Sequence, residues 1–492
     1  MNRRNCLQHI LIPAAFALTS SSVVVAQEPS MPGMEMPAQG EMRHHNAAQA
    51  EFLPRFGQAQ KEARGKLFTL EEAQETARAK NPTLRQAEAG IRAAKARQMQ
   101  AGLLPNPVAG YSGDEIRGGE AGGGKQGFFV EQRIVTGGKL AKSREVFSKD
   151  TSLAEIEVEE QKIRVETAIK MAFYRVLAAQ ELADVRGQLA RIAEENAVIS
   201  KRLGNTGQAD ETEILEAELE AHRLRLAERM QENTLREEWR SLAAAMGDPG
   251  MEQMTVAGEL ERGWPELSDQ EVLDAIARNS PAVRIADATA ARNSAEAVRA
   301  QREAIPDLRV RAGLLYNNEL LGGAPHATGW EGTAEVGVEI PIFNRNQGNV
   351  AAARAEAERA EEEKRRIALT LRERAASVLD QYSNARLMVE QYRIEILPRA
   401  KKAYALTEEK HGEMLASYPR VLETQRRLFE LHSEYVAALE SVWTNGIALQ
   451  GYLLTDGLEA PARPGEMDRP VRETNVPMPE RTMGPEARAP RP

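Results

Sequence analysis

The pattern of apolar positions between residues 138 and 203 predicts one very long helix. This stretch has no proline and a single internal glycine, Gly187, and it is rich in residues that favour helices. At ~1.5 Å per residue it would form a rod of roughly 100 Å. Its second half has the spacing of a helix that packs lengthwise on others, at Val185, Leu189, Ile192, Ile199 and Leu203.

The same kind of pattern returns between residues 346 and 411. A second apolar stripe follows helical spacing at Ile367, Leu371, Val378, Tyr382, Val389, Tyr392 and Ile396. Pro398 should disturb only the last part of this second helix. The chain is therefore predicted to be organised around two long helices of the same type.

Shorter elements repeat around these two helices. Capping-box patterns stand at residues 69–72 and 268–271, and Pro82 and Pro281 each follow one of them, about 200 residues apart. Alternating apolar positions around a glycine-rich loop predict two strands in each half. We expect a first repeat at 67–246 (strands at about 107–136, long helix 138–203), a linker at 247–267, and a second repeat at 268–455 (strands at about 307–343, long helix 346–411). An internal duplication explains this order.

The two ends of the chain differ from the repeats in composition. Arg3, Arg4, an apolar core and small residues up to Ala26 predict a cleaved signal peptide over residues 1–26. Cys6, the single cysteine, precedes that core, so we expect no lipid anchor. Residues 27–66 and 456–492 are predicted to be disordered, the first rich in Met and His and the second in Pro, Arg and Met. No other stretch approaches the ~20 apolar residues of a transmembrane helix.

Composition narrows the class of protein. Of 492 residues, 28% are charged and only 5% are aromatic, which suits long helices with much exposed surface. The formal net charge of −9 argues against nucleic acid as a partner, although ordinary solubility explains it equally well. The sequence has no catalytic serine, phosphate-loop or zinc-protease motif. We therefore expect neither an enzyme nor a bound cofactor.

Four strands in an exported chain suggest a share of a membrane barrel. Three copies would give twelve strands, an even number suited to an outer membrane, and the long helices would continue as a helical tube in the periplasm. The aromatic residues Tyr111, Phe128, Phe129, Tyr316, Trp330 and Phe343 flank the strands, where an interfacial girdle would lie. The alternative is that these rings pack a small soluble sheet.

The chain resembles the outer membrane efflux protein (TolC-like) family over residues 67–455. The resemblance rests on the duplicated layout, on Asn81-Pro82, on Leu104-Pro105-Asn106-Pro107 before the first strand, on residues 339–343 after the fourth, and on residues 214–217 and 421–424 beyond the two hairpin tips. It implies a homotrimer in outer membrane lipid that acts as a passive duct. It also implies a periplasmic adaptor and an inner-membrane resistance-nodulation-division pump as partners.

This resemblance implies that the hairpin tips are where the adaptor docks and where the aperture lies. Adaptor docking would involve Arg202, Leu203, Gly204 and Gly207 at one tip and Lys410, Gly412, Leu415 and Ser417 at the other. Carboxylates near the tips would ring the aperture in a trimer and select for cations: Asp210, Glu211, Glu408, Glu409 and Glu413. The alternative for each of these acids is a place on a solvated helix face.

The N-terminal segment indicates which cargo the protein would export. It carries thioether and imidazole groups at Met31, Met34, Met36, Met42, His44 and His45, which suit copper and silver and, for imidazole, zinc or nickel. We therefore expect export of heavy-metal cations, either copper and silver or cobalt, zinc and cadmium. The alternatives are a channel of the same architecture for drugs or small organic compounds, or a periplasmic adaptor or structural coiled-coil protein.

Overall fold

The computed structural model describes residues 66–116, 123–207, 209–320 and 326–461. The first half contains α3 (Leu70–Lys80), α4 (Pro82–Ala101), β1 (Val108–Asp114), β2 (Lys125–Ile134), α5 (Lys139–Asn205) and α6 (Glu211–Met246). The second contains α7 (Asp269–Asn279), α8 (Pro281–Arg302), β3 (Leu308–Leu320), β4 (Ala327–Val338), α9 (Gln347–Gln391), α10 (Leu397–Gly412) and α11 (Tyr418–Gln450). The same order of elements occurs twice, which confirms the mainly helical, duplicated fold.

Local sequence signals set the starts of several helices. Thr69 accepts a hydrogen bond from the Glu72 backbone N–H, and the Glu72 side chain accepts one from Thr69 N, which completes the predicted capping box of α3. Pro82 and Pro281 occupy the first turns of α4 and α8, behind the caps Asn81 and Ser280. The second capping box is wrong, because the Ser268 side chain makes no cap bond at α7.

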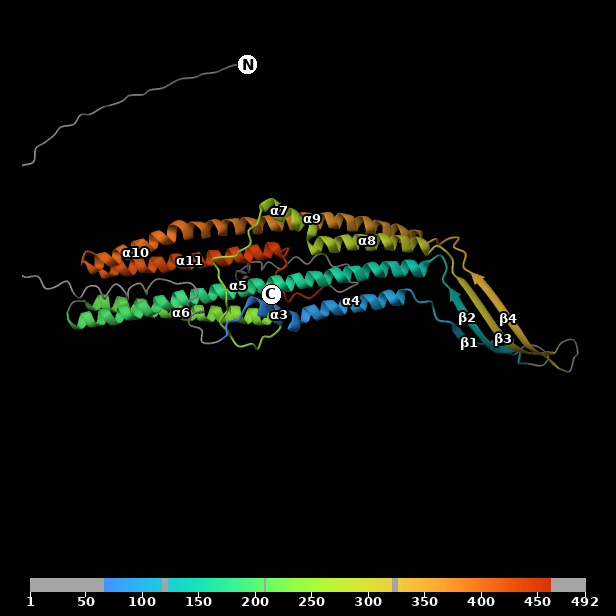
Figure 1. Ribbon diagram of the computed structural model, residues 1–492. Coiled ribbons are helices and arrows are strands. Elements are labelled where there is room, and N and C mark those ends of the chain that lie inside the picture. Colours follow the sequence, from blue (N-terminus) through green and yellow to red (C-terminus); the bar gives the residue numbers. More distant parts are fainter. Residues whose placement is uncertain (1–65, 117–122, 208, 321–325, 462–492) are drawn as a thin grey trace, which may run out of the picture. The chain divides into compact units, whose positions relative to one another are not determined.

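The first long helix is continuous and packs on both halves of the chain. α5 has 67 residues and lies beside α4, α6, α8 and α11 (Figure 1). Its middle forms the centre of the main apolar core, with Ile169, Phe173 and Leu177 almost fully buried. Farther along, Val185 and Ile192 are buried as predicted, whereas Ile199 remains 45% exposed in the single chain.

The second long helix is not a single α-helix. A π-helical turn at Tyr392–Ile396 separates α9 from α10, just before Pro398, where the sequence predicts a disturbance of the last part of the helix. Pro398 has no backbone N–H and displaces the hydrogen-bond ladder one turn before it. The Tyr392 hydroxyl donates to Glu434 Oε2 on α11 at 2.5 Å, which fixes the turn against its neighbour. The predicted apolar stripe faces the core, with Tyr382 and Val389 buried.

The connection at residues 247–267 is more than a linker. Phe68 pairs with Val256 in a short parallel bridge, and Val256 and Leu260 belong to the apolar core. The Trp443 indole N–H donates to Leu260 O at 2.9 Å, and the Tyr435 hydroxyl donates to Glu261 Oε1 at 3.0 Å. This segment therefore joins the two repeats by packing.

The C-terminal tail also begins later than predicted. Residues 456–461 pack against the first repeat, where Asn81 Nδ2 donates to Gly457 O at 3.4 Å and Gln161 Nε2 donates to Glu459 O at 3.2 Å. Arg164 forms an ion pair with the Glu459 carboxylate. The expected disorder from residue 456 is wrong for this short stretch, because it supplies acceptors to side chains of α4 and α5. Residues beyond 461 lie outside the described part.

Gly247→Ala should destabilise the protein more than Gly207→Ala. Both glycines have positive φ, +80° and +73°, so each substitution costs about 1–2 kcal/mol of backbone strain. A Cβ at Gly247 would also lie 2.7 Å from Lys80 O, whereas one at Gly207 would meet nothing within 4 Å. We expect a further loss of about 1–3 kcal/mol at Gly247 from this overlap. Thermal unfolding of both variants measures the difference, and equal melting temperatures would contradict it.

Candidate functional site

The four strands form one antiparallel sheet with two chemically different faces. The strand order is β1-β2-β3-β4, and the register aligns Tyr111, Phe128 and Leu314 across three strands. The face that holds these residues is almost entirely apolar: Ala109, Tyr111, Phe128, Val130, Ile134, Leu308, Val310, Leu314, Tyr316, Trp330, Val336 and Val338. Phe128 is 72% exposed and Trp330 is 71% exposed. Such a large exposed apolar face marks a surface that meets a partner or lipid.

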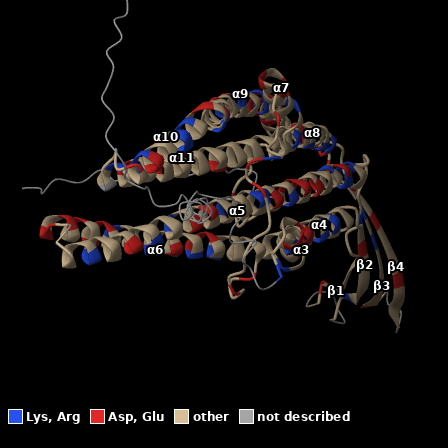
Figure 2. Ribbon diagram, turned by 60° about the vertical axis from the view of Figure 1, so that its left-hand side comes forward, with Lys and Arg blue, Asp and Glu red and all other residues tan. Residues whose placement is uncertain are grey.

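The opposite face is charged. Register places Glu131, Arg311 and Glu335 in one row across β2, β3 and β4, so an arginine lies between two carboxylates. Farther along the sheet, Lys125 Nζ lies 3.4 Å from Glu331 Oε2. Figure 2 shows the charged residues on these strands. An apolar face backed by a charged face is the alternation of a membrane barrel wall around a polar lumen.

The aromatic residues divide between the faces. Tyr111 packs edge-to-face on Phe128 with ring centroids 6.0 Å apart, and Tyr316 packs on Trp330 at 5.5 Å. All four lie on the apolar face, where an interfacial girdle would need them. Phe129 does not, because it lies on the charged face with the Arg311 guanidinium 3.7 Å above its ring. The prediction of a girdle role for Phe129 is therefore wrong.

Strand length and free edges complete the description of the sheet. β2, β3 and β4 have 10, 13 and 12 residues, long enough to cross a bilayer at a tilt, and β1 has 7. In the described chain, β1 and β4 each have a strand neighbour on one side only. An open four-stranded sheet of this kind exposes two rows of backbone hydrogen-bonding groups.

A buried ion pair fixes the junction between sheet and helices. Lys139, at the start of α5, places Nζ 2.9 Å from Asp307 Oδ1, just before β3, and Arg133 Nε lies 3.1 Å from Asp307 Oδ2. Burial raises the pKa of the Asp307 carboxyl, but bonds from Lys139 and the Thr136 N–H, with Arg133 nearby, hold that pKa below its usual value. The carboxylate therefore stays charged and links both repeats where the helices begin.

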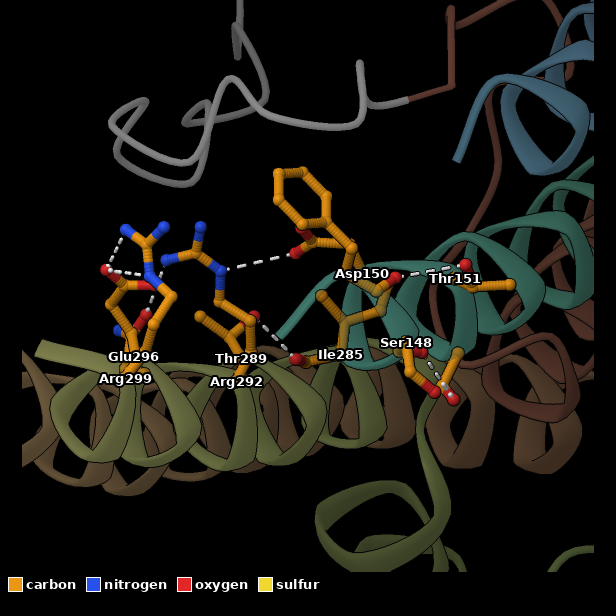
Figure 3. A network of polar contacts seen from close by, with 11 residues as sticks. Ser148, Asp150, Thr151, Ile285, Thr289, Arg292, Glu296 and Arg299 are labelled. Carbon is orange, nitrogen blue, oxygen red and sulfur yellow. Dashed lines mark hydrogen bonds and ion pairs between the residues drawn. The ribbon is translucent and has the colours of Figure 1, made fainter. Parts of the chain in front are cut away.

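A second polar network joins α5 to α8 beyond this junction. Figure 3 shows Arg292 of α8 reaching Asp150 of α5, with Nε 3.2 Å from Oδ1. On the same helix, Arg299 pairs with Glu296 at 2.6 Å, and the Thr289 hydroxyl donates to Ile285 O at 2.8 Å (Figure 3). The Arg292–Asp150 contact joins the two repeats, whereas the other two contacts lie within α8.

The first hairpin tip is a tight turn between α5 and α6. Gly204 allows close packing here, because a Cβ would lie 2.3 Å from Ile214 Cδ1. Thr206 N donates to Leu203 O at 3.1 Å, and Gly207 has a φ of +73°. The side chains of Arg202 and Leu203 are exposed. Since α5 begins beside the sheet, this tip lies at the far end of the helices (Figure 1).

The second tip is larger and more exposed. α10 ends at Gly412, and Leu415 N returns to Lys410 O at 2.8 Å. Met414 has a φ of +60° and is 95% exposed, and Leu415 is 74% exposed. His411 Nδ1 lies 2.9 Å from Ala416 O. Lys410 and Ser417 are exposed as well. This tip therefore presents the apolar side chains of Met414 and Leu415 on a turn that its own hydrogen bonds stabilise.

The five predicted aperture carboxylates have different surroundings. Asp210 caps α6 and accepts from Glu213 N at 2.7 Å, so it already has a structural role. Glu408 is half-buried, and burial raises the pKa of its carboxyl. Glu211, Glu409 and Glu413 are exposed. The structure places Asp210 and Glu211 at one tip and the other three at the second.

The candidate metal ligands of the N-terminal segment lie outside the described residues. This applies to Met31, Met34, Met36, Met42, His44 and His45. Within the described residues, no group of three or more His, Cys, Asp or Glu side chains is arranged to hold a metal ion. None of the described helices combines the length and apolar character needed to span a bilayer.

Comparison with known proteins relates the second repeat to a known family. The model of the outer membrane efflux protein family matches residues 272–453, the second repeat. Residues 272–453 therefore form a domain of the outer membrane efflux protein family. The cobalt-zinc-cadmium resistance protein CzcC of Cupriavidus metallidurans is 26% identical over 388 residues, which cover 77% of this chain and 88% of that protein.

Solved structures agree on the fold of this chain. CusC superposes with a TM-score of 0.64 at 16% identity, over 78% of this chain and 91% of that one. The outer-membrane channel OprN gives 0.64 at 14% identity over 79% and 90%. The open state of MtrE from Neisseria gonorrhoeae gives 0.63 at 16% identity over 79% and 89%. The chain therefore has the TolC-like fold.

Proposed function

We propose that three copies of this chain form the passive exit duct of a tripartite efflux system. The observation that supports this most strongly is the two-faced sheet, apolar on one side and charged on the other, joined directly to the two long helical hairpins. The apolar faces would contact outer membrane lipid and the charged faces would line water. The helices would continue the duct into the periplasm.

The free edges of the sheet favour a trimer. Four strands cannot close a barrel, but three copies contribute twelve strands, an even number typical of outer membrane barrels. Pairing β1 of one copy with β4 of the next would satisfy both exposed rows of backbone groups. The apolar side chains left exposed on α5 and α6, such as Ile199 and Leu219, would be covered by a neighbouring copy in the same assembly.

The tips would receive the partners. Exposed Leu203 and Leu415 offer apolar contacts at the end farthest from the sheet, as docking of a periplasmic adaptor requires. A resistance-nodulation-division pump in the inner membrane would supply the energy. Three copies of Glu211, Glu409 and Glu413 would place exposed carboxylates around the aperture and favour cations. Asp210, as a helix cap, contributes its charge with less freedom to move.

The cargo is most consistent with heavy-metal cations. The similar protein CzcC is named for resistance to cobalt, zinc and cadmium. Met31, Met34 and Met36 add soft thioether groups, and His44 and His45 add imidazoles, which together favour copper or silver. We place this segment as a transient capture site before the duct, while the duct itself remains a conduit.

Growth of a deletion strain tests the cargo. The strain should lose tolerance to copper and silver, or to cobalt, zinc and cadmium, and the full-length gene should restore it. A gene lacking residues 31–45 should restore copper and silver tolerance only in part, because the soft ligands are gone. Unchanged metal tolerance, together with new sensitivity to dyes and antibiotics, would contradict metal export and move the substrate to organic compounds.

A further inference from the structure

A preformed hollow lies beside the first strand, on the helix side of the sheet. It has a volume of about 360 Å³ and is lined by residues 104–107 and 132–134. Pro105 and Pro107 stiffen one wall, and Gln132 Nε2 donates to Pro105 O at 2.9 Å, which ties that wall to β2. Leu104 is 67% exposed at the mouth. The hollow is open and shaped in advance, and four of its seven lining residues are apolar: Leu104, Pro105, Pro107 and Ile134.

A large side chain projects beside the last strand, at the opposite edge of the same sheet. Phe343 follows β4 and is 91% exposed. The turn that presents it is held by hydrogen bonds: Gln347 Nε2 donates to Phe343 O at 3.3 Å, and Asn346 Nδ2 donates to Ala300 O at 2.8 Å. Ile342 N also donates to Ile340 O at 2.9 Å. The backbone of this turn is therefore held in place, and the Phe343 ring has little apolar cover in the single chain.

The topology of the sheet brings these two features together when copies meet. β1 and β4 are the outer strands and run in opposite directions, so β4 of one copy can pair with β1 of another as an antiparallel neighbour. The hollow precedes the start of β1, and Phe343 follows the end of β4. Both therefore lie at the helix-side end of the edges that would join.

We propose that Phe343 of each copy inserts into the hollow formed by residues 104–107 and 132–134 of the next copy. This inference rests on the proposed trimer and names one contact between neighbouring copies in it. The ring would contact Leu104, Pro105, Pro107 and Ile134 in a site whose walls already exist, so little conformational freedom is lost on docking. In the proposed closed trimer, a heterologous contact of this kind would leave no hollow open.

A cysteine cross-link tests the contact directly. The single native cysteine, Cys6, is replaced by serine, and Leu104→Cys is combined with Phe343→Cys in the full chain. Oxidation should join the copies into dimers and trimers that survive denaturation and disappear with reductant. Each single variant should remain monomeric on the same gel. As a matched control, Phe128→Cys with Phe343→Cys should not cross-link, because Phe128 lies farther along β2 although it is exposed on the sheet's apolar face.

Two further measurements separate the outcomes. Native mass determination reports the trimer independently: a trimer without cross-link overturns this inference alone, whereas a monomer overturns the proposed function with it. A nitroxide label on the single variant Phe343→Cys should be shielded from both oxygen and a water-soluble nickel chelate. If oxygen reached the label readily and the nickel chelate did not, the side chain would lie in lipid, and this result would also overturn the contact.

Discussion

The substitution Leu314→Arg is expected to prevent stable insertion of the protein into the outer membrane. Leu314 lies in β3 on the apolar face and is 62% exposed. An arginine facing lipid near the middle of a bilayer costs about 2–4 kcal/mol, and a trimer would bear that cost three times. Quantitative blotting of outer membrane fractions measures the effect, and we expect at least a tenfold drop in inserted protein.

The neighbouring residue provides the matched control. Leu315→Arg makes the same change one position along β3, where side chains point to the charged face opposite Glu331. The new guanidinium would meet a carboxylate and water rather than lipid, so insertion should be close to normal. Equal loss for both variants would contradict the assignment of the two faces, because a general fault in folding would then explain the result.

Glu157→Gln is expected to stabilise the protein increasingly as the pH rises. Glu157 is buried in α5, and burial, with Glu160 and Asp150 nearby, raises the pKa of its carboxyl from 4.5 to about 7. The folded chain therefore holds a proton that the unfolded chain releases, and stability falls as pH rises from 4.5 towards 7. Glutamine has no proton to release, so the variant avoids that loss.

The expected gain is about 1–3 kcal/mol at pH 8 and close to zero at pH 4, since each unit of pKa shift corresponds to about 1.4 kcal/mol. Melting temperatures of both proteins between pH 4 and pH 8 measure the difference. Glu155→Gln is the control on the same helix, because the Glu155 side chain is 52% exposed. A gain for Glu157→Gln that is the same at every pH would contradict a raised pKa.

Much of the fold follows from residue spacing alone. The two long helices, the strand pairs and the duplication are visible because apolar residues repeat with helical period over many turns. The paired starts at Pro82 and Pro281 depend on backbone properties that proline has in any protein. These are local signals, so they can be interpreted from the sequence without knowledge of the tertiary contacts.

Features that depend on distant contacts were not predictable in the same way. Val256 and Leu260 are two apolar residues in a stretch of Pro and Gly, and only packing on α5 and α11 reveals their role. The assignment of Phe129 failed because strand register, and not the presence of an aromatic ring, decides which face a side chain occupies. Pro398 marks the π-helical turn at Tyr392–Ile396 in the sequence, but the bond from Tyr392 that fixes this turn against α11 depends on Glu434, far along the chain.

The candidate site was predictable in position more than in detail. Glycines at 204, 207 and 412 mark the two tips in the sequence, and the structure has its hairpin turns there. The role of each carboxylate was not predictable, because Asp210 proves to be a helix cap and Glu408 is half-buried. Which acids face the duct depends on how three copies meet, and this stays a prediction.

The number of copies in the membrane tests the central claim most directly. Protein extracted in mild detergent from the outer membrane fraction should have, by native mass spectrometry, the mass of three mature chains. Heating before electrophoresis should convert that complex to single chains. A single chain recovered from the soluble periplasmic fraction would contradict the account, because an open four-stranded sheet with an apolar face would then have neither lipid nor a partner to cover it.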